Sequence, residues 1–276
     1  MGYYVRVEPD VHIYVEDVYP QGKKAVLFLH GWPANHRMFE YQFDALTREG
    51  IRCIGMDMRG FGQSDRPADG YGYDRLSDDV AQVIDALRLQ DITLLGFSIG
   101  GAIALRYMAR HGQKGVARLA LCGAAAPSVT RRPGFPYGVP AEDVTRLVEG
   151  ARSNRPQMVE EFGETFFFRN TTAAFKGWFQ SMALPAAGWA TAQCAETFRD
   201  ETLFADMPKV TVPTLIMHGV RDAVCLFPLA QALHQGIAGS RLVPFEACGH
   251  GFFWEERADG SVRNGHRQNS NARSTD

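Results

Sequence analysis

The chain has 276 residues, of which 45% are hydrophobic and 22% are charged, and its formal net charge is −2. This length and composition are typical of a globular protein with one large α/β core. The small net charge argues against a nucleic acid or an anionic membrane as a partner, and no apolar run reaches the roughly 18–20 residues that span a bilayer.

The N-terminus and the cysteines indicate the compartment. Residues 1–6 lack the apolar stretch of a signal peptide. The five cysteines are an odd number, form no CxxC motif and lie mostly in apolar runs. We therefore expect buried free thiols and a cytoplasmic location. Cys248, two residues before His250, is a candidate for exposure in a cleft.

The first half of the chain alternates between strand and helix patterns. Apolar residues alternate over residues 3–17, which predicts an antiparallel hairpin. After it, strands are expected at 25–30, 51–57, 92–97 and 116–122, with helical patterns between them. The alternation predicts a doubly wound α/β fold with a mostly parallel sheet, whose ligand site lies beyond the carboxyl ends of the strands.

This alternation stops near Gly123 and resumes near Val212. Residues 124–140 have the composition of a loop, and residues 141–207 show only helical patterns, which predicts an inserted helical cap. A strand at 212–218, a helix at 226–237 and a strand at 241–246 follow. The predicted organisation is a core of residues 1–123 and 209–257, a cap of residues 124–208 and a disordered polar tail of residues 258–276.

Residues 92–101 carry the strongest chemical signal. An apolar strand runs directly into Gly96-Phe-Ser98-Ile-Gly100, a G-x-S-x-G sequence that a helical pattern follows. This context predicts a sharp strand–turn–helix with Ser98 at its apex, in a strained backbone conformation and raised away from the sheet. Gly96 and Gly100 are expected because the strand and the helix approach too closely there for a side chain. Ser98 is therefore the candidate nucleophile.

A serine needs a base within hydrogen-bond reach to act as a nucleophile at neutral pH. Among the eight histidines, His250 lies in a Gly-flanked loop just past the last strand, at the same sheet edge as Ser98. His250 is the candidate base. His30 and His218 also end strands, and we interpret both as structural, with His30 holding the loop that follows its strand.

The base needs a carboxylate to orient it. Asp222 follows the penultimate strand and gives the chain order Ser98, Asp222, His250, which is the order expected for a nucleophile elbow on such a sheet. Asp57 also ends a strand and is the main rival, although it precedes Arg59 and can pair locally. Glu246 lies within the last strand and is less well placed. We assign Asp222 as the acid.

The oxyanion of an acyl-transfer reaction needs two donors. The Ile99 N–H follows Ser98 at a helix N-terminus and is the first candidate. The second must come from the loop after the strand at 25–30, which makes the Trp32 N–H the candidate. Pro33 has no N–H and favours an extended conformation at Trp32.

The predicted cap is rich in aromatic side chains. Most of them must pack the cap onto the sheet, but some should line an apolar pocket over Ser98. The candidates for this lining are Trp32, Phe166, Trp178, Phe179 and Met182. Such a pocket favours a neutral acyl or aryl substrate over a charged or sugar substrate. The sequence contains no metal or nucleotide motif, so we expect no metal and no cofactor.

Six segments together resemble the α/β-hydrolase superfamily, and within it the cofactor-free haloperoxidase, arylesterase and perhydrolase group. The resemblance covers roughly residues 3–255 and rests on His30–Pro33, Asp57–Ser64, Gly96–Gly101, Arg106–Gly112, Val212–Gly219 and Gly249–Gly251. It implies an α/β-hydrolase fold, a Ser98–His250–Asp222 triad, Trp32 and Ile99 as oxyanion donors, and ester hydrolysis without a cofactor.

One detail agrees with this group, and two details depart from the family's pattern. In that group a proline after the oxyanion tryptophan, as Pro33 is here, accompanies perhydrolysis, in which peroxide replaces water as acyl acceptor. Ala102-Ile103 stand where the group usually carries a third glycine and an acidic residue. The family ends in an amphipathic helix that residues 258–276 cannot supply.

The sequence thus predicts a serine carboxylesterase that hydrolyses small neutral or aryl esters through an acyl-enzyme. We expect a small-molecule ester as its partner, no nucleic acid and no membrane, with a homo-oligomer left open. One alternative keeps the triad for perhydrolase, lactonase or amidase activity. Another, of a different class, is a hydrolase-fold ligand sensor or regulatory partner.

Overall fold

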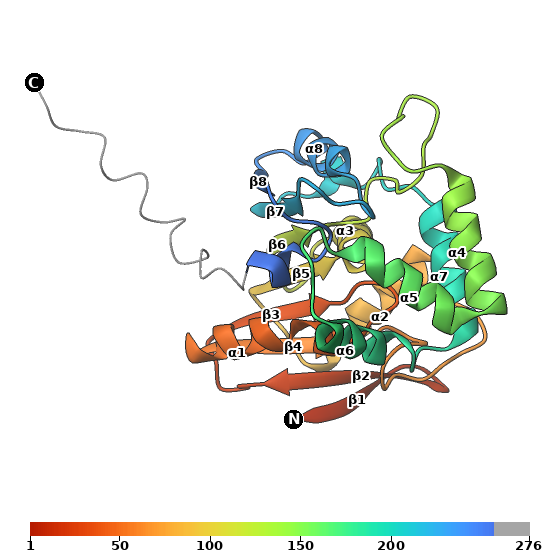
Figure 1. Cartoon of the computed structure of the whole chain (residues 1–276). Coiled ribbons are helices and arrows are strands. Elements are labelled where there is room, and N and C mark those ends of the chain that lie inside the picture. The colour runs from red at the N-terminus through yellow and green to blue at the C-terminus, as the bar shows by residue number, and fades with distance from the viewer. Residues whose placement is uncertain (257–276) are drawn as a thin grey trace, which may run out of the picture.

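A single eight-stranded sheet forms the centre of the computed structural model, which describes residues 1–256 (Figure 1). The strand order is β1-β2-β4-β3-β5-β6-β7-β8. The strands are β1 (Gly2–Glu8), β2 (Val11–Val18), β3 (Lys24–Leu29), β4 (Ile51–Met56), β5 (Ile92–Phe97), β6 (Val116–Cys122), β7 (Thr214–Gly219) and β8 (Arg241–Phe245). The tail expected at 258–276 lies outside the described residues.

The sheet is mostly parallel, as predicted. Strand β2 pairs antiparallel with both β1 and β4, whereas the six strands from β4 to β8 in the spatial order pair in parallel. The central strands are apolar on both faces because helices cover both, and Leu27, Phe28 and Leu94 are fully buried. Parallel pairing brings the loops after these strands to one edge of the sheet.

Helices follow most strands of the core, and the long insertion between β6 and β7 is also helical. The helices are η1 (His36–Phe39), α1 (Glu40–Arg48), α2 (Tyr73–Ala86), α3 (Ile99–Arg110), α4 (Ala141–Ser153), α5 (Arg155–Phe166), α6 (Ala173–Ala183), α7 (Gly188–Asp200), η2 (Met207–Lys209), α8 (Phe227–Gly236) and α9 (Phe252–Glu255). Helix α4 packs on α7, and α5 packs on α6. Figure 1 shows α4, α5 and α7 grouped at one side of the sheet.

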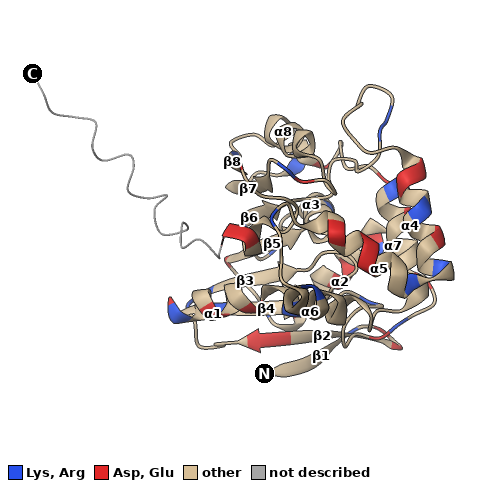
Figure 2. Cartoon of the chain, viewed as in Figure 1, with Lys and Arg blue, Asp and Glu red and all other residues tan. Residues whose placement is uncertain are grey.

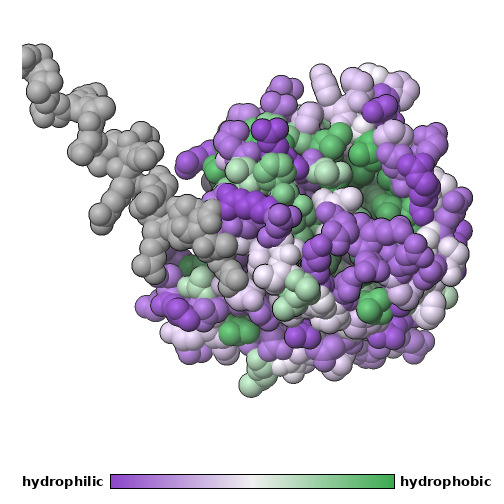
Figure 3. Space-filling model, viewed as in Figure 1, coloured by the Kyte–Doolittle hydropathy of each residue, from purple (hydrophilic) through white to green (hydrophobic). Residues whose placement is uncertain are grey.

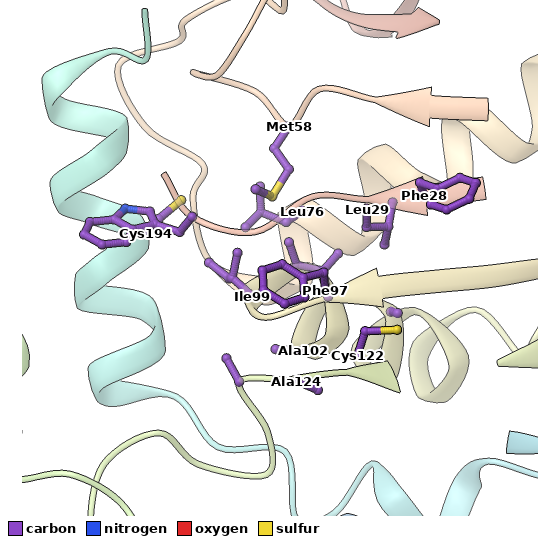
Figure 4. Packing of buried hydrophobic residues seen from close by; sticks show 14 of the residues in the cluster. Phe28, Leu29, Met58, Leu76, Phe97, Ile99, Ala102, Cys122, Ala124 and Cys194 are labelled. Carbon is purple, nitrogen blue, oxygen red and sulfur yellow. The ribbon is translucent and has the colours of Figure 1, made fainter. Parts of the chain in front are cut away.

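The core converges on the turn between β5 and α3. Figure 4 shows Phe97 at the end of β5 beside Ile99 at the start of α3, with Ala102 of the same helix near Ala124 after β6. These four side chains are buried. The turn is therefore held by packing on both sides of the residue between Phe97 and Ile99.

The five cysteines are free and buried, as expected. Cys248 is not exposed in a cleft; its thiol is buried and donates to Glu256 Oε1 at 3.0 Å. Within residues 1–256, no helix combines the length and the apolar character needed to cross a membrane.

Candidate active site

Ser98 sits at the apex of the β5–α3 turn with φ 56° and ψ −121°. This positive φ costs free energy for a residue with a side chain, and packing around the turn has to maintain it. A side chain on Gly96 would meet the Gly100 carbonyl at 2.2 Å, and one on Gly100 would meet the Leu29 carbonyl at 2.3 Å. The sharp turn and the need for both glycines are as the sequence predicts.

His250 and Asp222 are hydrogen-bonded in the loops after β8 and β7. The distance from His250 Nδ1 to Asp222 Oδ2 is 2.6 Å, and both side chains are fully buried. A carboxylate only accepts hydrogen bonds, so Nδ1 carries the hydrogen, and in the neutral tautomer the lone pair is on Nε2. Within the described chain, His250 Nε2 has no hydrogen-bond partner. The imidazole is thus oriented as a general base would need to be.

The histidine ring lies against the residue before Ser98. The ring centroids of Phe97 and His250 are 4.7 Å apart, and Phe166 of α5 packs edge-on against His250 at 4.9 Å. Ser98 and Cys225 line the same cavity. Burial raises the pKa of Cys225 well above its ordinary value, and the charge of Asp222 adds to this.

Four donors surround the Asp222 carboxylate. Oδ1 accepts the backbone N–H groups of Val224 and Cys225, both at 2.8 Å. Oδ2 accepts from His250, and His218 Nε2 lies 3.2 Å from the same oxygen. Burial alone would raise the pKa of Asp222, but the positive charge that His250 can carry and the hydrogen bonds from both histidines outweigh it. The pKa is therefore held well below its usual range, and Asp222 stays ionised.

His218 has a closer relation to the acid than the sequence indicates. It is fully buried at the end of β7, and its Nε2 donates to the Cys225 carbonyl at 2.6 Å as well as facing Asp222. The carbonyl only accepts, so Nε2 must carry the hydrogen. The spacing of four residues between His218 and Asp222 at a strand end is the signal that could have revealed this contact.

The rival acid has other partners. Asp57 Oδ1 accepts the backbone N–H of His36 at 2.8 Å and lies 2.7 Å from His36 Nδ1, while Oδ2 accepts the Gln63 N–H at 2.9 Å. Local pairing of Asp57 with Arg59 is wrong, because Arg59 instead pairs with Asp79 at 2.7 Å. Asp57 therefore braces the loop after β4.

The structure also shows the surroundings of Glu246, the third candidate acid, and of His30. Glu246 is exposed. His30 accepts the Met58 N–H on Nε2 at 2.9 Å, and its Nδ1 lies 3.0 Å from the Gly31 carbonyl. Burial lowers the pKa of His30 to about 4, so the ring is neutral near pH 7. As expected, His30 ties the loop after β3 to the loop after β4.

The two predicted oxyanion donors flank Ser98. Ile99 is the first residue of α3, and Trp32 lies in the loop after β3, next to a Gly31 at which a side chain would come within 3.2 Å of Ser98 Cβ. Within residues 1–256, the N–H groups of Trp32 and Ile99 have no hydrogen-bond acceptor. The Trp32–Pro33 peptide is cis. That these two amides bind the oxyanion beside Ser98 stays a prediction.

The side chain of Trp32 fixes the loop that carries its amide. Its Nε1 donates to the Thr191 carbonyl of α7 at 2.9 Å, and its ring packs edge-on against Phe162 and Phe198, with centroids 5.0 and 5.6 Å apart. The helices of the insertion therefore hold the candidate oxyanion loop in place.

A cavity of about 510 Å³ opens onto Ser98 between α4, α5 and the loop after β7. Trp32 lines it as predicted, but Phe166, Trp178, Phe179 and Met182 are not among its lining residues. The apolar walls come instead from Val144, Leu147, Met158, Phe162 and Phe198, together with neighbours of the loops after β6 and β7.

The four displaced candidates pack the insertion onto the core. Phe166 contacts His250, and Phe179 packs against Phe166 with centroids 4.6 Å apart. Trp178 packs edge-on against Tyr41, and the Met182 carbonyl accepts a hydrogen bond from Asn35 at 3.1 Å. Helix α6 lies on the core next to η1, so its apolar face is already covered.

Glu255 holds the loop that carries His250, a role that no sequence pattern indicates. This buried carboxylate accepts the Gly249 N–H and the Arg169 N–H, both at 2.7 Å. The Gly251 N–H donates in turn to the Phe166 carbonyl at 3.0 Å. The base loop and the segment after α5 are thus clamped together on either side of His250.

The sequence model of the protein family "alpha/beta hydrolase fold" matches residues 24–257 of this chain. The chain belongs to the α/β-hydrolase family. This α/β-hydrolase is 45% identical over 257 residues to the AB hydrolase superfamily protein YisY of Bacillus subtilis, covering 93% of this chain and 95% of that protein. It is 32% identical to the non-heme chloroperoxidase CPO-A1 of Kitasatospora aureofaciens, covering 87% of this chain and 89% of the relative.

Among solved structures, the α/β-hydrolase is similar to an esterase, EaEST, from Exiguobacterium antarcticum. The TM-score is 0.92 at 46% identity, covering 95% of this chain and 97% of the esterase. The resemblance to the cofactor-free haloperoxidase and esterase group is therefore confirmed.

Proposed function

We propose that this carboxylic ester hydrolase is a serine carboxylesterase that works through Ser98, His250 and Asp222. The observation that carries the proposal is the 2.6 Å hydrogen bond from His250 Nδ1 to Asp222, next to a serine held at positive φ. A nucleophile elbow, an oriented imidazole and an ionised acid are the parts that acyl transfer needs.

In the proposed mechanism Ser98 Oγ attacks the ester carbonyl while His250 Nε2 accepts the hydroxyl proton. Asp222 keeps the hydrogen on Nδ1 and stabilises the imidazolium that forms. The N–H groups of Ile99 and Trp32 stabilise the oxyanion. His250 then returns the proton to the leaving alcohol, an acyl-enzyme remains, and a water molecule activated by His250 releases the acid.

The first step requires a hydrogen bond between Ser98 and His250 Nε2. His250 Nε2 is without a hydrogen-bond partner in residues 1–256. We expect the serine hydroxyl to turn toward Nε2 when an ester carbonyl occupies the oxyanion site, since such contacts often tighten only in the substrate complex.

The substrates are proposed to be neutral esters, small aryl and alkyl esters among them. Apolar side chains form most of the wall beside Ser98, and the one cationic side chain of the described lining, Arg146, belongs to α4. A pocket of this kind selects by shape and apolar contact.

The direct test is hydrolysis of p-nitrophenyl acetate by the wild-type protein and by Ser98→Ala. We expect steady-state turnover, and a loss of about 10⁶-fold in kcat for the variant. A variant that keeps most of the activity would refute the assignment. A single burst that leaves Ser98 or His250 modified, without turnover, would favour the ligand-sensor alternative.

Perhydrolysis is the second candidate, and the observation that favours it is Pro33 directly after the candidate oxyanion Trp32. Here hydrogen peroxide in place of water would attack the acyl carbon of the acyl-enzyme, the bond from that carbon to Ser98 Oγ would break, and the acyl group would leave as a peracid. Peracid formation from acetate and hydrogen peroxide, compared with hydrolysis of a small lactone and an amide, separates this candidate from lactonase and amidase activity.

A further inference from the structure

The cavity beside Ser98 has a direction that helix α5 defines. The C-terminal end of α5 lies over the candidate base, because Phe166 packs on the His250 ring and its carbonyl accepts the Gly251 N–H. The N-terminal end of α5 points away from this contact. A molecule that follows α5 from its C-terminal to its N-terminal end therefore moves away from the catalytic residues.

The cavity follows one face of α5 over its whole length. The lining residues of this segment recur at helical spacing and are Asn154, Gln157, Met158, Glu161, Phe162 and Thr165. At about 1.5 Å of rise per residue, this face is roughly 16 Å long. The cavity thus extends well beyond the reach of an acetyl group.

Helix α4 forms the opposite wall, so the two helices make a wedge that we call the α4–α5 wedge. It is lined on the α4 side by Val144, Leu147 and Gly150 and on the α5 side by Met158 and Phe162. The wedge closes where the helices touch, since a side chain on Gly150 would come within 2.9 Å of Met158. Figure 3 shows apolar surface inside a hollow on this side of the molecule.

The polar side chains of the wedge already have partners within the helices. Arg146 pairs with Asp143. On α5, Gln157 donates to Glu161 at 2.8 Å and accepts from Asn154 at 2.9 Å. Ser153 and Thr165 donate to helix carbonyls at 2.8 and 2.9 Å. These groups do not need a ligand to satisfy them.

The charges of the wedge also disfavour an anionic ligand. The lining holds one cation, Arg146, and two carboxylates, Asp143 and Glu161. Figure 2 shows both signs of charge along α4 and α5, with uncharged residues between them. A carboxylate or phosphate on the ligand would therefore find no free positive partner in the described lining, whereas a hydrocarbon chain can bury itself against the aliphatic walls.

We infer that the α4–α5 wedge is the binding site for an extended, unbranched hydrocarbon chain of the ester substrate. The inference rests on the proposed esterase function and extends it from small esters to esters of medium chain length. The chain can belong to the acyl group or to the alcohol, because the same apolar contacts would hold either.

Two substrate series test this inference. One is p-nitrophenyl esters of increasing acyl length from acetate to decanoate, and the other is acetates of unbranched alcohols of increasing length. In one series kcat/KM should rise about fourfold for each methylene that enters the wedge, and then level off. The series that rises identifies the side of the ester that the wedge binds.

Substitutions at Leu147 test the location. Leu147→Trp should fill the wedge, so that the rise of kcat/KM with chain length levels off at a shorter chain. Leu147→Ala should widen the wedge, so that this rise continues to a longer chain. The readout is the ratio of kcat/KM for a long ester to that for acetate, which a general loss of folded protein does not change. Glu149→Trp is the matched control, because Glu149 is exposed on α4 and does not line the cavity; it should keep the wild-type ratio.

The outcomes separate the two proposals. No turnover of p-nitrophenyl acetate by the wild-type protein would refute the esterase function itself. Turnover of p-nitrophenyl acetate with no rise of kcat/KM in either series would refute the wedge as the binding site of the chain. The esterase function would then stand. A rise that both Leu147 variants leave unchanged would place the chain elsewhere and also overturn the inference.

Discussion

Replacement of His218 tests how the acid is held. Its Nε2–H is shared between the Cys225 carbonyl at 2.6 Å and Asp222 Oδ2 at 3.2 Å, in a fully buried site. His218→Leu removes the donor and keeps an apolar side chain of moderate size. His218→Gln can place an amide N–H near the position of Nε2 and is the conservative comparison.

The expected loss of stability follows from these two contacts. A hydrogen bond to a neutral group contributes roughly 0.5–1.5 kcal/mol and one to a charged group roughly 1.5–3 kcal/mol, so His218→Leu should cost roughly 2–4 kcal/mol. For a protein of this size that lowers Tm by roughly 5–15 °C. His218→Gln should recover a substantial part of the loss. Thermal unfolding monitored by circular dichroism measures both.

The effect on catalysis should fall on kcat. His218 does not line the cavity, so substrate binding and KM should stay close to the wild-type values. Loss of the His218 donor lets Asp222 and with it His250 shift, and a misplacement of about 1 Å can cost about 100-fold in rate. The reasoning fails if His218→Leu keeps the wild-type Tm and kcat, or if His218→Gln is as impaired in both as His218→Leu.

Three further predictions concern the groups around the base. Asp222→Asn should lower kcat by about 10⁴-fold, because an amide allows the wrong His250 tautomer; wild-type kcat in this variant would remove Asp222 from the mechanism. Since the folded pKa of Asp222 is depressed, its stabilising contribution is complete above the ordinary carboxyl pKa of about 3.9 and is lost as the pH falls below that value. In urea titrations, the unfolding free energy of Asp222→Asn should therefore depend less on pH in that range than that of the wild-type protein. His30, whose pKa burial lowers to about 4, binds fewer protons when folded than when unfolded, so the unfolding free energy should decrease as the pH falls from about 6.5 to 4. His30→Gln should flatten this decrease, and an unchanged slope would contradict the interpretation. Glu255→Gln replaces one of two acceptor oxygens by a donor that faces a backbone N–H, so it should cost roughly 1.5–3 kcal/mol and lower kcat more than KM; the exposed Glu246→Gln is the control, and equal behaviour of the two variants would be evidence against the clamp.

Local sequence patterns were sufficient for the fold because each one reports a local preference or burial on both faces of a strand. The apolar runs at 25–30, 51–57, 92–97 and 116–122 correspond to β3, β4, β5 and β6. The elbow was predictable for the same reason. Gly96 is required by the turn itself, because a side chain there would meet the Gly100 carbonyl, whereas Gly100 is required because its backbone lies against Leu29 at the end of β3.

The lining of the cavity and the support of the base could not be predicted in this way. An aromatic side chain such as Phe179 can cover the core or line a pocket, and which it does depends on how the helices of the insertion dock. The same holds for Glu255, which reaches Arg169 across 86 positions of the chain.

The sequence alone thus determined the order of strands and helices, the elbow at Ser98 and the pairing of His250 with Asp222 as candidates, because these follow from periodicity, turn geometry and chain order. Only the tertiary structure decided that α4 and α5 enclose the cavity, that His218 also faces the acid and that Glu255 clamps the base loop. The free energies of these contacts depend on distances and burial in the folded chain, which a pattern of residue types does not specify.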